Sequence, residues 1–253
     1  MKVRELVQHI DSFAPFELCE EWDNSGLLVG DNDSDITRVG VCLDAVTCAV
    51  TEAHKRGCNV LVTHHPLIFR PLKRITASTE QGRTILEAAR LNVSVIAAHT
   101  NWDKAYGGVN DTLAALLGLN DCESLGDFGL CGILGESMRT EDFAHHVRES
   151  WGLSRLDVYA SAMPERVSRV ALCGGAGSEF WTAAKSMGAD VYITADMKYH
   201  ELSDAVNDGM TIALACHGEM ERASIPELAR KISACGIDTE IIGVNALSEP
   251  IRV

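Results

Sequence analysis

The sequence predicts an α/β protein with two pseudo-symmetric α/β lobes and mostly parallel sheets. Short apolar runs alternate with longer amphipathic ones along the whole chain. The apolar runs are rich in Val, Ile and Ala and show no polar alternation, which is typical of strands buried on both faces of a parallel sheet. In addition, the second half of the chain repeats the pattern of the first half.

Seven apolar runs have the length and composition of strands. They cover residues 39–43, 59–63, 93–98, 169–173, 190–194, 211–215 and 240–244. Helical periodicity separates them near residues 45–57, 80–91, 109–117, 177–188, 198–208 and 222–235. Several of these helices end at a glycine, where a left-handed C-cap costs little.

The repeat suggests how the chain is divided. Residues 39–63 and 169–194 share a strand–helix–strand pattern with closely matched spacing. The alternative is that any two such units resemble each other by chance. We expect residues 1–120 to form the first lobe, and 121–253 to form a connecting segment and the second lobe.

Composition excludes several classes of protein. The 253 residues carry a formal net charge of −14, which argues against general nucleic-acid binding. Nine cysteines without a Cys-x-x-Cys pair give no disulfide framework. Polar and charged residues interrupt the apolar stretch that a signal peptide would need at the N-terminus. No apolar run approaches the ~20 residues that span a bilayer. We therefore expect a soluble, cytoplasmic protein with no membrane association.

Two adjacent histidines follow the second predicted strand. In open α/β sheets ligands bind beyond the carboxyl ends of strands, which is where His64 and His65 lie. Their side chains should point in different directions and could serve two neighbouring metal ions. The alternative is a surface pair, and His145-His146, in a predicted exposed helical turn, provides an internal comparison.

Two further histidines are each followed, four residues later, by a carboxylate. His99 and Asp103 come after one predicted strand, and His217 and Glu221 after another, with the same offset of 118 residues (217 − 99 and 221 − 103). On one helical turn such a pair shares a face. A cap or surface contact would explain either pair alone.

Taken together, four histidines and two carboxylates predict a binuclear metal site. Imidazole nitrogen and carboxylate oxygen are suitable donors for two divalent ions. This donor set accepts zinc, iron or manganese and does not choose among them.

Three other features are compatible with function. Asp196 and His200 form a third i, i+4 pair, which could orient metal ligands or act as an acid/base pair, although Asp196 could equally cap its own helix. Residues 174–177 read Gly-Gly-Ala-Gly and suggest either phosphate contact or, more simply, a tight turn. Residues 22–30 read as a loop that enters a strand.

Several segments resemble the NIF-three-like family, whose members are often called GTP cyclohydrolase I type 2 homologues. The segments are Trp22-Asp-Asn-Ser-Gly-Leu-Leu-Val-Gly30, Thr63-His-His-Pro-Leu-Ile-Phe69, Ala98-His-Thr-Asn-Trp-Asp103, Gly108-Val-Asn-Asp111, Tyr192-Ile-Thr-Ala-Asp196, Tyr199-His200 and the His217…Glu221 pair. The resemblance implies two α/β lobes, a dinuclear metal centre and a toroidal homohexamer built from trimers.

The resemblance also implies a set of metal ligands. Glu221 would bridge the two ions, with His64 and Asp103 on one and His65 and His217 on the other. His99 would be a further ligand. The chain departs from the family pattern at Ala195, at Gly218 and in residues 128–135, which lack an arginine often found there. None of these departures removes a ligand.

Two functions are compatible with these observations. The first is a metal-dependent hydrolase, possibly GTP cyclohydrolase-like, that attacks a nucleotide or related small molecule through a metal-bridging hydroxide, with Asp196 and His200 as candidate catalytic residues. The second is a non-enzymatic metal-binding, storage or regulatory scaffold protein.

Overall fold

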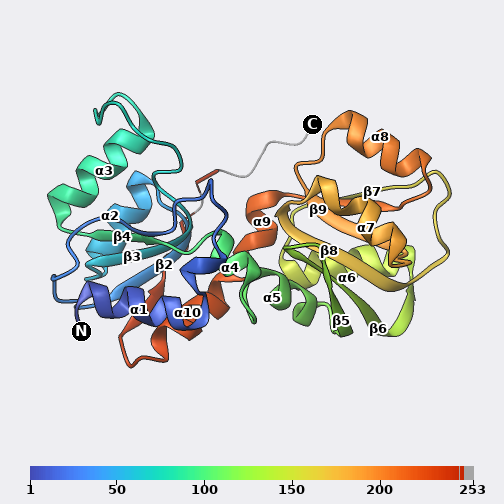
Figure 1. Cartoon of the computed structure of the whole chain (residues 1–253), viewed down its shortest axis with the longest axis horizontal. Coiled ribbons are helices and arrows are strands. Elements are labelled where there is room, and N and C mark those ends of the chain that lie inside the picture. Colours follow the sequence, from blue (N-terminus) through green and yellow to red (C-terminus); the bar gives the residue numbers. More distant parts are fainter. Residues whose placement is uncertain (245, 248–253) are drawn as a thin grey trace. The chain divides into compact units, whose positions relative to one another are not determined.

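The computed structural model describes residues 1–244 and 246–247, which fold into two compact units (Figure 1). The first unit consists of residues 1–106 and the described residues from 225 onward. The second consists of residues 107–224. The expected division placed the boundary at residue 120 and the C-terminal segment in the second lobe. In the structure, that segment returns to the first unit.

The first unit contains a five-stranded sheet in the order β1-β4-β3-β2-β11. Its strands are β1 (Gly26–Val29), β2 (Val39–Asp44), β3 (Val60–His65), β4 (Ser94–Ala97) and β11 (Thr239–Ile241). The pairings β4-β3, β3-β2 and β2-β11 are parallel, and β1 runs antiparallel to β4 at one edge. The three central strands are almost completely buried, as their continuous apolar sequences predict.

Helices cover both faces of this sheet (Figure 1). They are α1 (Val3–Phe13), α2 (Thr47–Lys55), α3 (Glu80–Leu91), α4 (Thr100–Lys104) and α10 (Ile225–Ser233), with a 3-10 turn at Phe16–Leu18. Helices α2 and α3 pack on one face around Leu61 and Val95. Helix α10 contacts β2, β11 and α1, so the C-terminal part of the chain is needed to complete this unit.

The second unit contains a six-stranded sheet in the order β5-β6-β8-β9-β10-β7. Its strands are β5 (Leu119–Leu125), β6 (Gly129–Arg139), β7 (Leu156–Tyr159), β8 (Arg166–Ala176), β9 (Val191–Ala195) and β10 (Ile212–Ala215). Strands β8, β9 and β10 are parallel neighbours, whereas β5, β6 and β7 add antiparallel pairings at the two edges.

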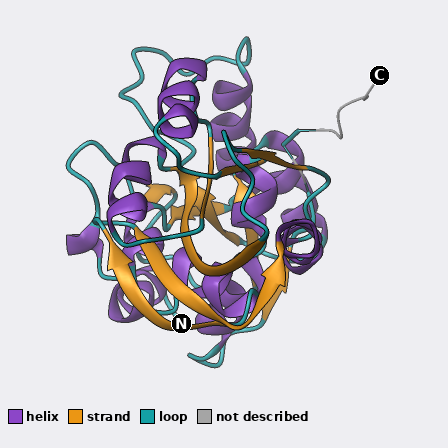
Figure 2. Ribbon diagram, turned by 90° about the vertical axis from the view of Figure 1, so that its right-hand side faces the viewer, coloured by secondary structure: helices purple, strands orange, loops and turns teal. Residues whose placement is uncertain are grey.

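Helices also line both faces of the second sheet. Figure 2 draws helices in purple and strands in orange. The helices of this unit are α5 (Val109–Leu116), α6 (Thr140–Trp151), α7 (Trp181–Ser186), α8 (Tyr199–Asn207) and α9 (His217–Arg222), with a 3-10 turn at Ser178–Phe180. The residues of α7 and α8 pack around Tyr192 and Ile212. Helix α5 packs against β8 from the other side, where Leu113 and Val109 approach Gly174.

The predicted α/β class is confirmed, each sheet has a core of parallel strands, and each unit contains the predicted repeat. Strands β2, β3 and β4 with their helices correspond in order to β8, β9 and β10 with theirs. The predicted strands do not include the antiparallel strands β5, β6 and β7. Strand β5 is polar and largely exposed, so it lacks an apolar run. No helix of the described residues is long and apolar enough to span a bilayer.

Candidate metal centre

His64 and His65 end strand β3, and each is held by a hydrogen bond at Nδ1. His64 is fully buried, and its Nδ1 lies 3.0 Å from the carbonyl oxygen of Ala98. His65 Nδ1 lies 2.7 Å from Oδ1 of Asp44, the last residue of the neighbouring strand β2. Both contacts favour the tautomer that carries its proton on Nδ1. In that tautomer Nε2 carries the lone pair that a metal ion would bind.

His99 and Asp103 lie on the short helix α4, directly after β4. The amide of Asp103 donates to the carbonyl oxygen of His99 at 3.0 Å, so the two residues are one helical turn apart, as their spacing predicts. Asp103 is buried, and its Oδ1 lies 3.6 Å from Nε2 of His64. The helical turn therefore delivers a carboxylate to the buried histidine.

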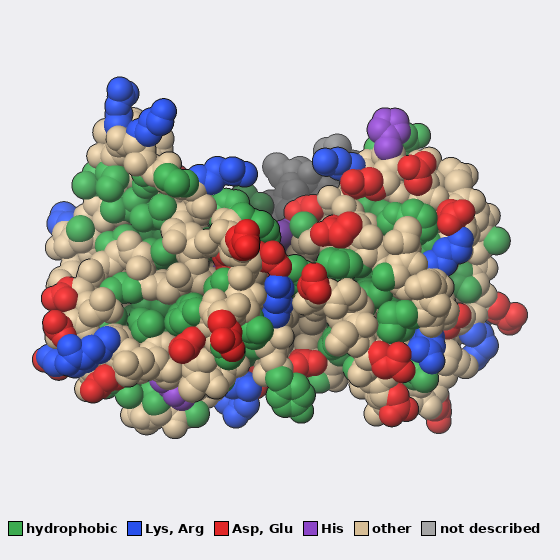
Figure 3. All heavy atoms as spheres, in the orientation of Figure 1, with side chains coloured by type: hydrophobic (Ala, Val, Ile, Leu, Met, Phe, Trp, Pro, Cys, Tyr) green, Lys and Arg blue, Asp and Glu red, His purple; other side chains and the backbone are tan. Residues whose placement is uncertain are grey.

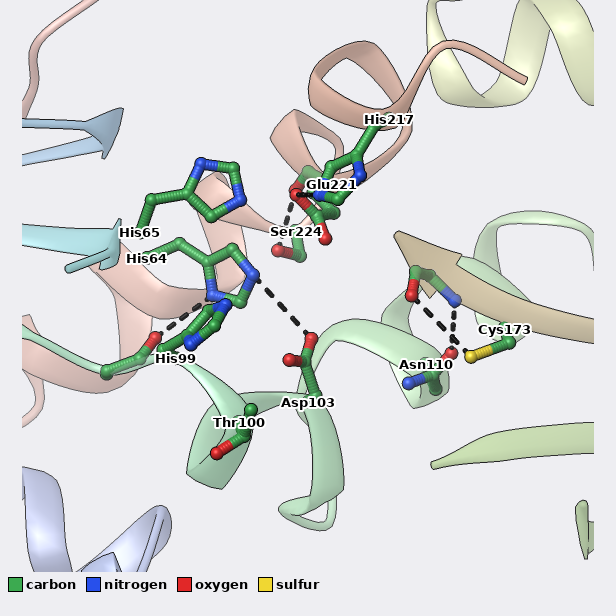
Figure 4. Close-up of polar contacts among 12 residues, drawn as sticks. His64, His65, His99, Thr100, Asp103, Asn110, Cys173, His217, Glu221 and Ser224 are labelled. Carbon is green, nitrogen blue, oxygen red and sulfur yellow. Dashed lines mark hydrogen bonds and ion pairs between the residues drawn. The ribbon is translucent and has the colours of Figure 1, made fainter. Parts of the chain in front are cut away.

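Three histidines of the first unit form a group that could hold a metal ion. His64, His65 and His99 each offer a nitrogen, and these three nitrogens lie within 4.8 Å of one another. The ring centroids of His64 and His65 are 5.0 Å apart, and those of His64 and His99 are 5.3 Å apart. Figure 4 shows the three rings together with Asp103. The structure thus brings together the histidines that the sequence suggested from three separate positions.

Asp23 is a supporting residue that the sequence analysis did not single out. Its side chain is fully buried and accepts hydrogen bonds from His99 Nδ1 at 2.8 Å, from the Thr100 hydroxyl at 2.6 Å and from the Thr100 amide at 3.1 Å. Burial alone would raise the pKa of Asp23, but the hydrogen bonds from His99 and Thr100 hold it well below its usual range. An ionised carboxylate therefore fixes the orientation of His99.

In the second unit, His217 and Glu221 lie one turn apart on α9. Nε2 of His217 is 3.1 Å from Oε2 of Glu221, and Nδ1 is 2.6 Å from Oδ2 of Asp196. Figure 4 shows the His217–Glu221 contact. Burial opposes protonation of His217, but the two carboxylates outweigh it and raise the pKa to about 9. These side chains offer nitrogen and oxygen donors of the same kind as those in the first unit.

Gly175 explains how β8 approaches this pair so closely. A Cβ at Gly175 would lie 2.3 Å from Oε1 of Glu221 and 3.3 Å from Nε2 of His217, and the residue adopts φ +68°. The neighbouring glycines, Gly174 and Gly177, are similarly confined by packing against Val109 and Cys173. Gly174 and Gly175 therefore lie within strand β8 and not in the tight turn that the sequence suggested, and their missing side chains allow the backbone to approach its neighbours closely.

The predicted catalytic residues, Asp196 and His200, have different surroundings in the structure. Asp196 contacts His217 and has a left-handed φ of +53°. Helix α8 begins at Tyr199, where the Lys198 amide donates to the Glu201 carboxylate. Asp196 therefore does not cap this helix. His200 is exposed on α8, where its ring lies 5.3 Å from that of Tyr199, and it makes no hydrogen bond within the described residues.

The comparison pair, His145-His146, lies on α6 as expected. His145 is exposed, and His146 is half-buried with Nε2 3.2 Å from the carbonyl oxygen of Leu117. That contact satisfies the C-terminal end of α5. No group of three potential ligands includes either residue among residues 1–244 and 246–247.

Comparison with known proteins finds relatives over nearly the whole chain. The family model Duf34/NIF3 (NGG1p interacting factor 3) matches residues 1–250. A "GTP cyclohydrolase 1 type 2 homolog" of Lactococcus lactis is 37% identical and aligns over 99% of this chain and 98% of its own length. A protein of the same name from Clostridium perfringens is 33% identical, with 100% and 99% coverage.

Solved structures show the same fold. The Staphylococcus aureus protein SA1388 is 25% identical and superimposes with a TM-score of 0.91, over 100% of this chain and 99% of that one. A Bacillus cereus protein related to NIF3 has the same TM-score and coverage at 24% identity. Because the family model and both relatives extend over nearly the whole chain, this protein belongs to the Duf34/NIF3 family.

Proposed function

We propose that the protein is a dinuclear metal-dependent hydrolase-type protein that acts on a nucleotide or related small molecule. Two divalent ions per chain, of zinc, iron or manganese, would be held by six side chains: His64, His65, His99, Asp103, His217 and Glu221. The observation that carries the proposal is the histidine group of the first unit, whose donor nitrogens lie within 4.8 Å of one another. Asp103 of the first unit and, at the positions that the repeat matches, His217 and Glu221 of the second unit would supply the remaining donors.

The donor chemistry fits divalent ions. In His65, His99 and His217, Nδ1 is hydrogen-bonded to an aspartate, and in His64 to a backbone carbonyl. Carboxylate or carbonyl acceptors behind a ligating imidazole fix the tautomer and the ring orientation, and they are typical of metal-binding histidines. Mixed nitrogen and oxygen donors suit zinc, iron and manganese.

When bound, such ions would lower the pKa of a coordinated water and polarise a substrate oxygen. The protein's own residues would hold this arrangement in place. Asp23 and Asp44 would keep His99 and His65 oriented, and Asp196 would do the same for His217. His200, exposed on α8, would exchange protons with solvent.

The names of the relatives support the substrate class. Curated proteins that cover the whole chain carry the name GTP cyclohydrolase 1 type 2 homolog. A purine nucleotide such as GTP is therefore the first substrate to test. The proposed assembly is a toroidal homohexamer built from trimers, and light scattering that gives a monomer would contradict it.

A second candidate is a non-enzymatic metal-binding, storage or regulatory scaffold protein. The family description, which names an interaction with another protein, favours it. Turnover separates the two candidates, because a scaffold would hold the ions without hydrolysing purine nucleotides or phosphoesters. Metal-loaded protein that hydrolyses none of these compounds would favour the scaffold.

Metal content per chain is the direct test of the proposed centre. Elemental analysis of untagged protein should find about two equivalents, following the proposed two-ion site. His64→Ala and Glu221→Gln should each lower this content by at least one ion. His145→Ala removes an exposed histidine on α6 and should change nothing. Equal metal content in all four proteins would contradict the proposal.

A further inference from the structure

An exposed pair of aromatic rings lies against His99 in the first unit. Trp22 and Phe69 are 57% and 38% exposed, and their ring centroids are 5.7 Å apart at an interplanar angle of 69°. Both rings also contact His99, with centroid distances of 6.2 Å and 6.1 Å. Two large apolar rings that stay accessible beside a group of histidines mark a candidate binding surface.

Hydrogen bonds anchor the residues next to Trp22 and Phe69. Asp23, next to Trp22, is anchored to His99 and Thr100 as described above. Asn24 Nδ2 donates to the carbonyl oxygen of Ile68, next to Phe69, which ties the two segments to each other. The aromatic surface is therefore preorganised, and binding would not require these rings to become ordered.

Positive charge borders the rings. The Arg70 guanidinium carbon lies 5.7 Å from the centroid of the Phe69 ring, and Lys73 and Arg74 follow in the same exposed segment. None of the three makes an ion pair within the described part of the chain. Residues 66–79 contain no acidic residue, although the whole chain has a net charge of −14. Figure 3 shows Lys and Arg side chains projecting where Figure 1 places the loop before α3.

We propose that Trp22, Phe69 and Arg70 form a binding platform for a planar heteroaromatic ring that carries an anionic group. One ring face of the ligand stacks on an aromatic side chain, while its anion pairs with the guanidinium of Arg70. The angle between Trp22 and Phe69 lets a flat ligand stack on one ring and meet the other at its edge. This inference rests on the proposed function, since the platform would place the bound small molecule beside His99, a proposed metal ligand.

Isothermal titration calorimetry with three probes tests the platform. GMP carries both a ring and an anion, guanosine only the ring, and ribose 5-phosphate only the anion. The full chain, loaded with Zn²⁺, should bind GMP more tightly than either of the other two. Trp22→Ala and Phe69→Ala should weaken GMP binding at least about tenfold, in keeping with the usual contribution of base stacking. Arg70→Gln should weaken the binding of GMP but not of guanosine.

Two matched control variants test whether the loss of GMP binding is specific to this surface. Tyr106→Ala removes another exposed aromatic ring of the first unit, and Arg90→Gln removes an exposed arginine on α3. Both should bind GMP as the wild type does. Unchanged GMP binding in Trp22→Ala and Phe69→Ala would overturn the platform, as would a wild type that binds neither GMP nor guanosine.

The same samples separate the platform from the metal proposal. Elemental analysis should find unchanged metal in Trp22→Ala and Phe69→Ala, because neither side chain is a proposed ligand. Metal-free protein that still binds GMP in a Trp22-dependent manner would support the platform. A wild type that takes up no metal at all would contradict the proposed function alone.

Discussion

At the scale of single residues, acidic side chains behind the histidines define the candidate centre. Asp23, Asp44 and Asp196 each lie within 2.8 Å of a histidine Nδ1. Asp23 lies 76 residues from His99 in the sequence, and Asp44 and Asp196 each lie 21 residues from the histidine that they contact. The orientation of each ring is therefore set by a neighbouring segment and not by the helix or strand that carries it.

Replacing Asp23 with asparagine should weaken metal binding without removing a ligand. The neutral amide cannot accept the His99, Thr100 amide and Thr100 hydroxyl bonds as a carboxylate does, so His99 should lose its fixed orientation. Loss of such a partner typically lowers metal affinity about 10–100-fold. Titration with a competing chelator measures this, and Asp33→Asn, at an exposed ion pair with Arg4, is the control. Equal affinities in both variants would show that Asp23 does not orient a ligand.

Alanine at Gly175 should displace the carboxylate of Glu221. The new Cβ would lie 2.3 Å from Oε1, so the side chain must move. Gly118→Ala is a matched control, because Gly118 has φ +69° and no atom within 4 Å of its Cβ position. Both variants should lose about 1 kcal/mol of unfolding free energy, because alanine disfavours the left-handed backbone conformation. Only Gly175→Ala should contain less bound metal, as measured by elemental analysis.

At the scale of elements, the ends of a helix follow from local chemistry that the sequence displays. Helix α3 shows this, and its first turn also contacts a second helix. Helix α3 begins after Thr79, whose side chain accepts from the Gly82 amide, and ends at Asn92 in the left-handed conformation. Glu80, in its first turn, also accepts from the amide of Thr47 at 2.9 Å and from Arg83 at 2.7 Å. One carboxylate thus joins the N-termini of α2 and α3.

The pH dependence of stability should report this contact. Hydrogen bonds from Thr47 and then Arg83 lower the pKa of Glu80 to about 2. A folded-state pKa below the unfolded value stabilises the protein above about pH 4.5, and this contribution is lost as the pH falls toward 2. Glu80→Gln should therefore lower the free energy of unfolding by about 1 kcal/mol or less at pH 7, since the side chain is half exposed. The loss should be smaller at pH 3.5.

Urea denaturation at the two pH values measures the difference. Glu149→Gln, on the exposed side of α6, is the control variant. A difference between wild type and Glu80→Gln that is constant from pH 7 to pH 3.5 would contradict the assigned role.

At the scale of the whole molecule, the chain builds its first unit in two pieces. Helix α10 buries Ile225, Leu228 and Ile232, and β11 pairs with β2. The second unit lies between these pieces in sequence and has its own sheet and core. A boundary drawn along the sequence alone would separate α10 and β11 from the sheet that they complete.

Fragments should reveal this discontinuous organisation. A fragment of residues 1–120 would expose the apolar surfaces that α10 and β11 cover, so it should not unfold cooperatively when heated. A fragment of residues 107–224 retains its sheet and should give a cooperative transition by circular dichroism. Cooperative unfolding of the first fragment would mean that the C-terminal segment is dispensable for that unit.

The sequence by itself determined the α/β class, the repeated strand–helix–strand pattern and the positions of the six candidate metal ligands. These depend on apolar periodicity and on residues that follow strand ends, both of which are local. Only the tertiary structure decided that Asp23 supports His99, that Gly175 makes room for Glu221 and that α10 and β11 complete the first unit. Each of these depends on contacts between segments distant in sequence, and such contacts have no local signature.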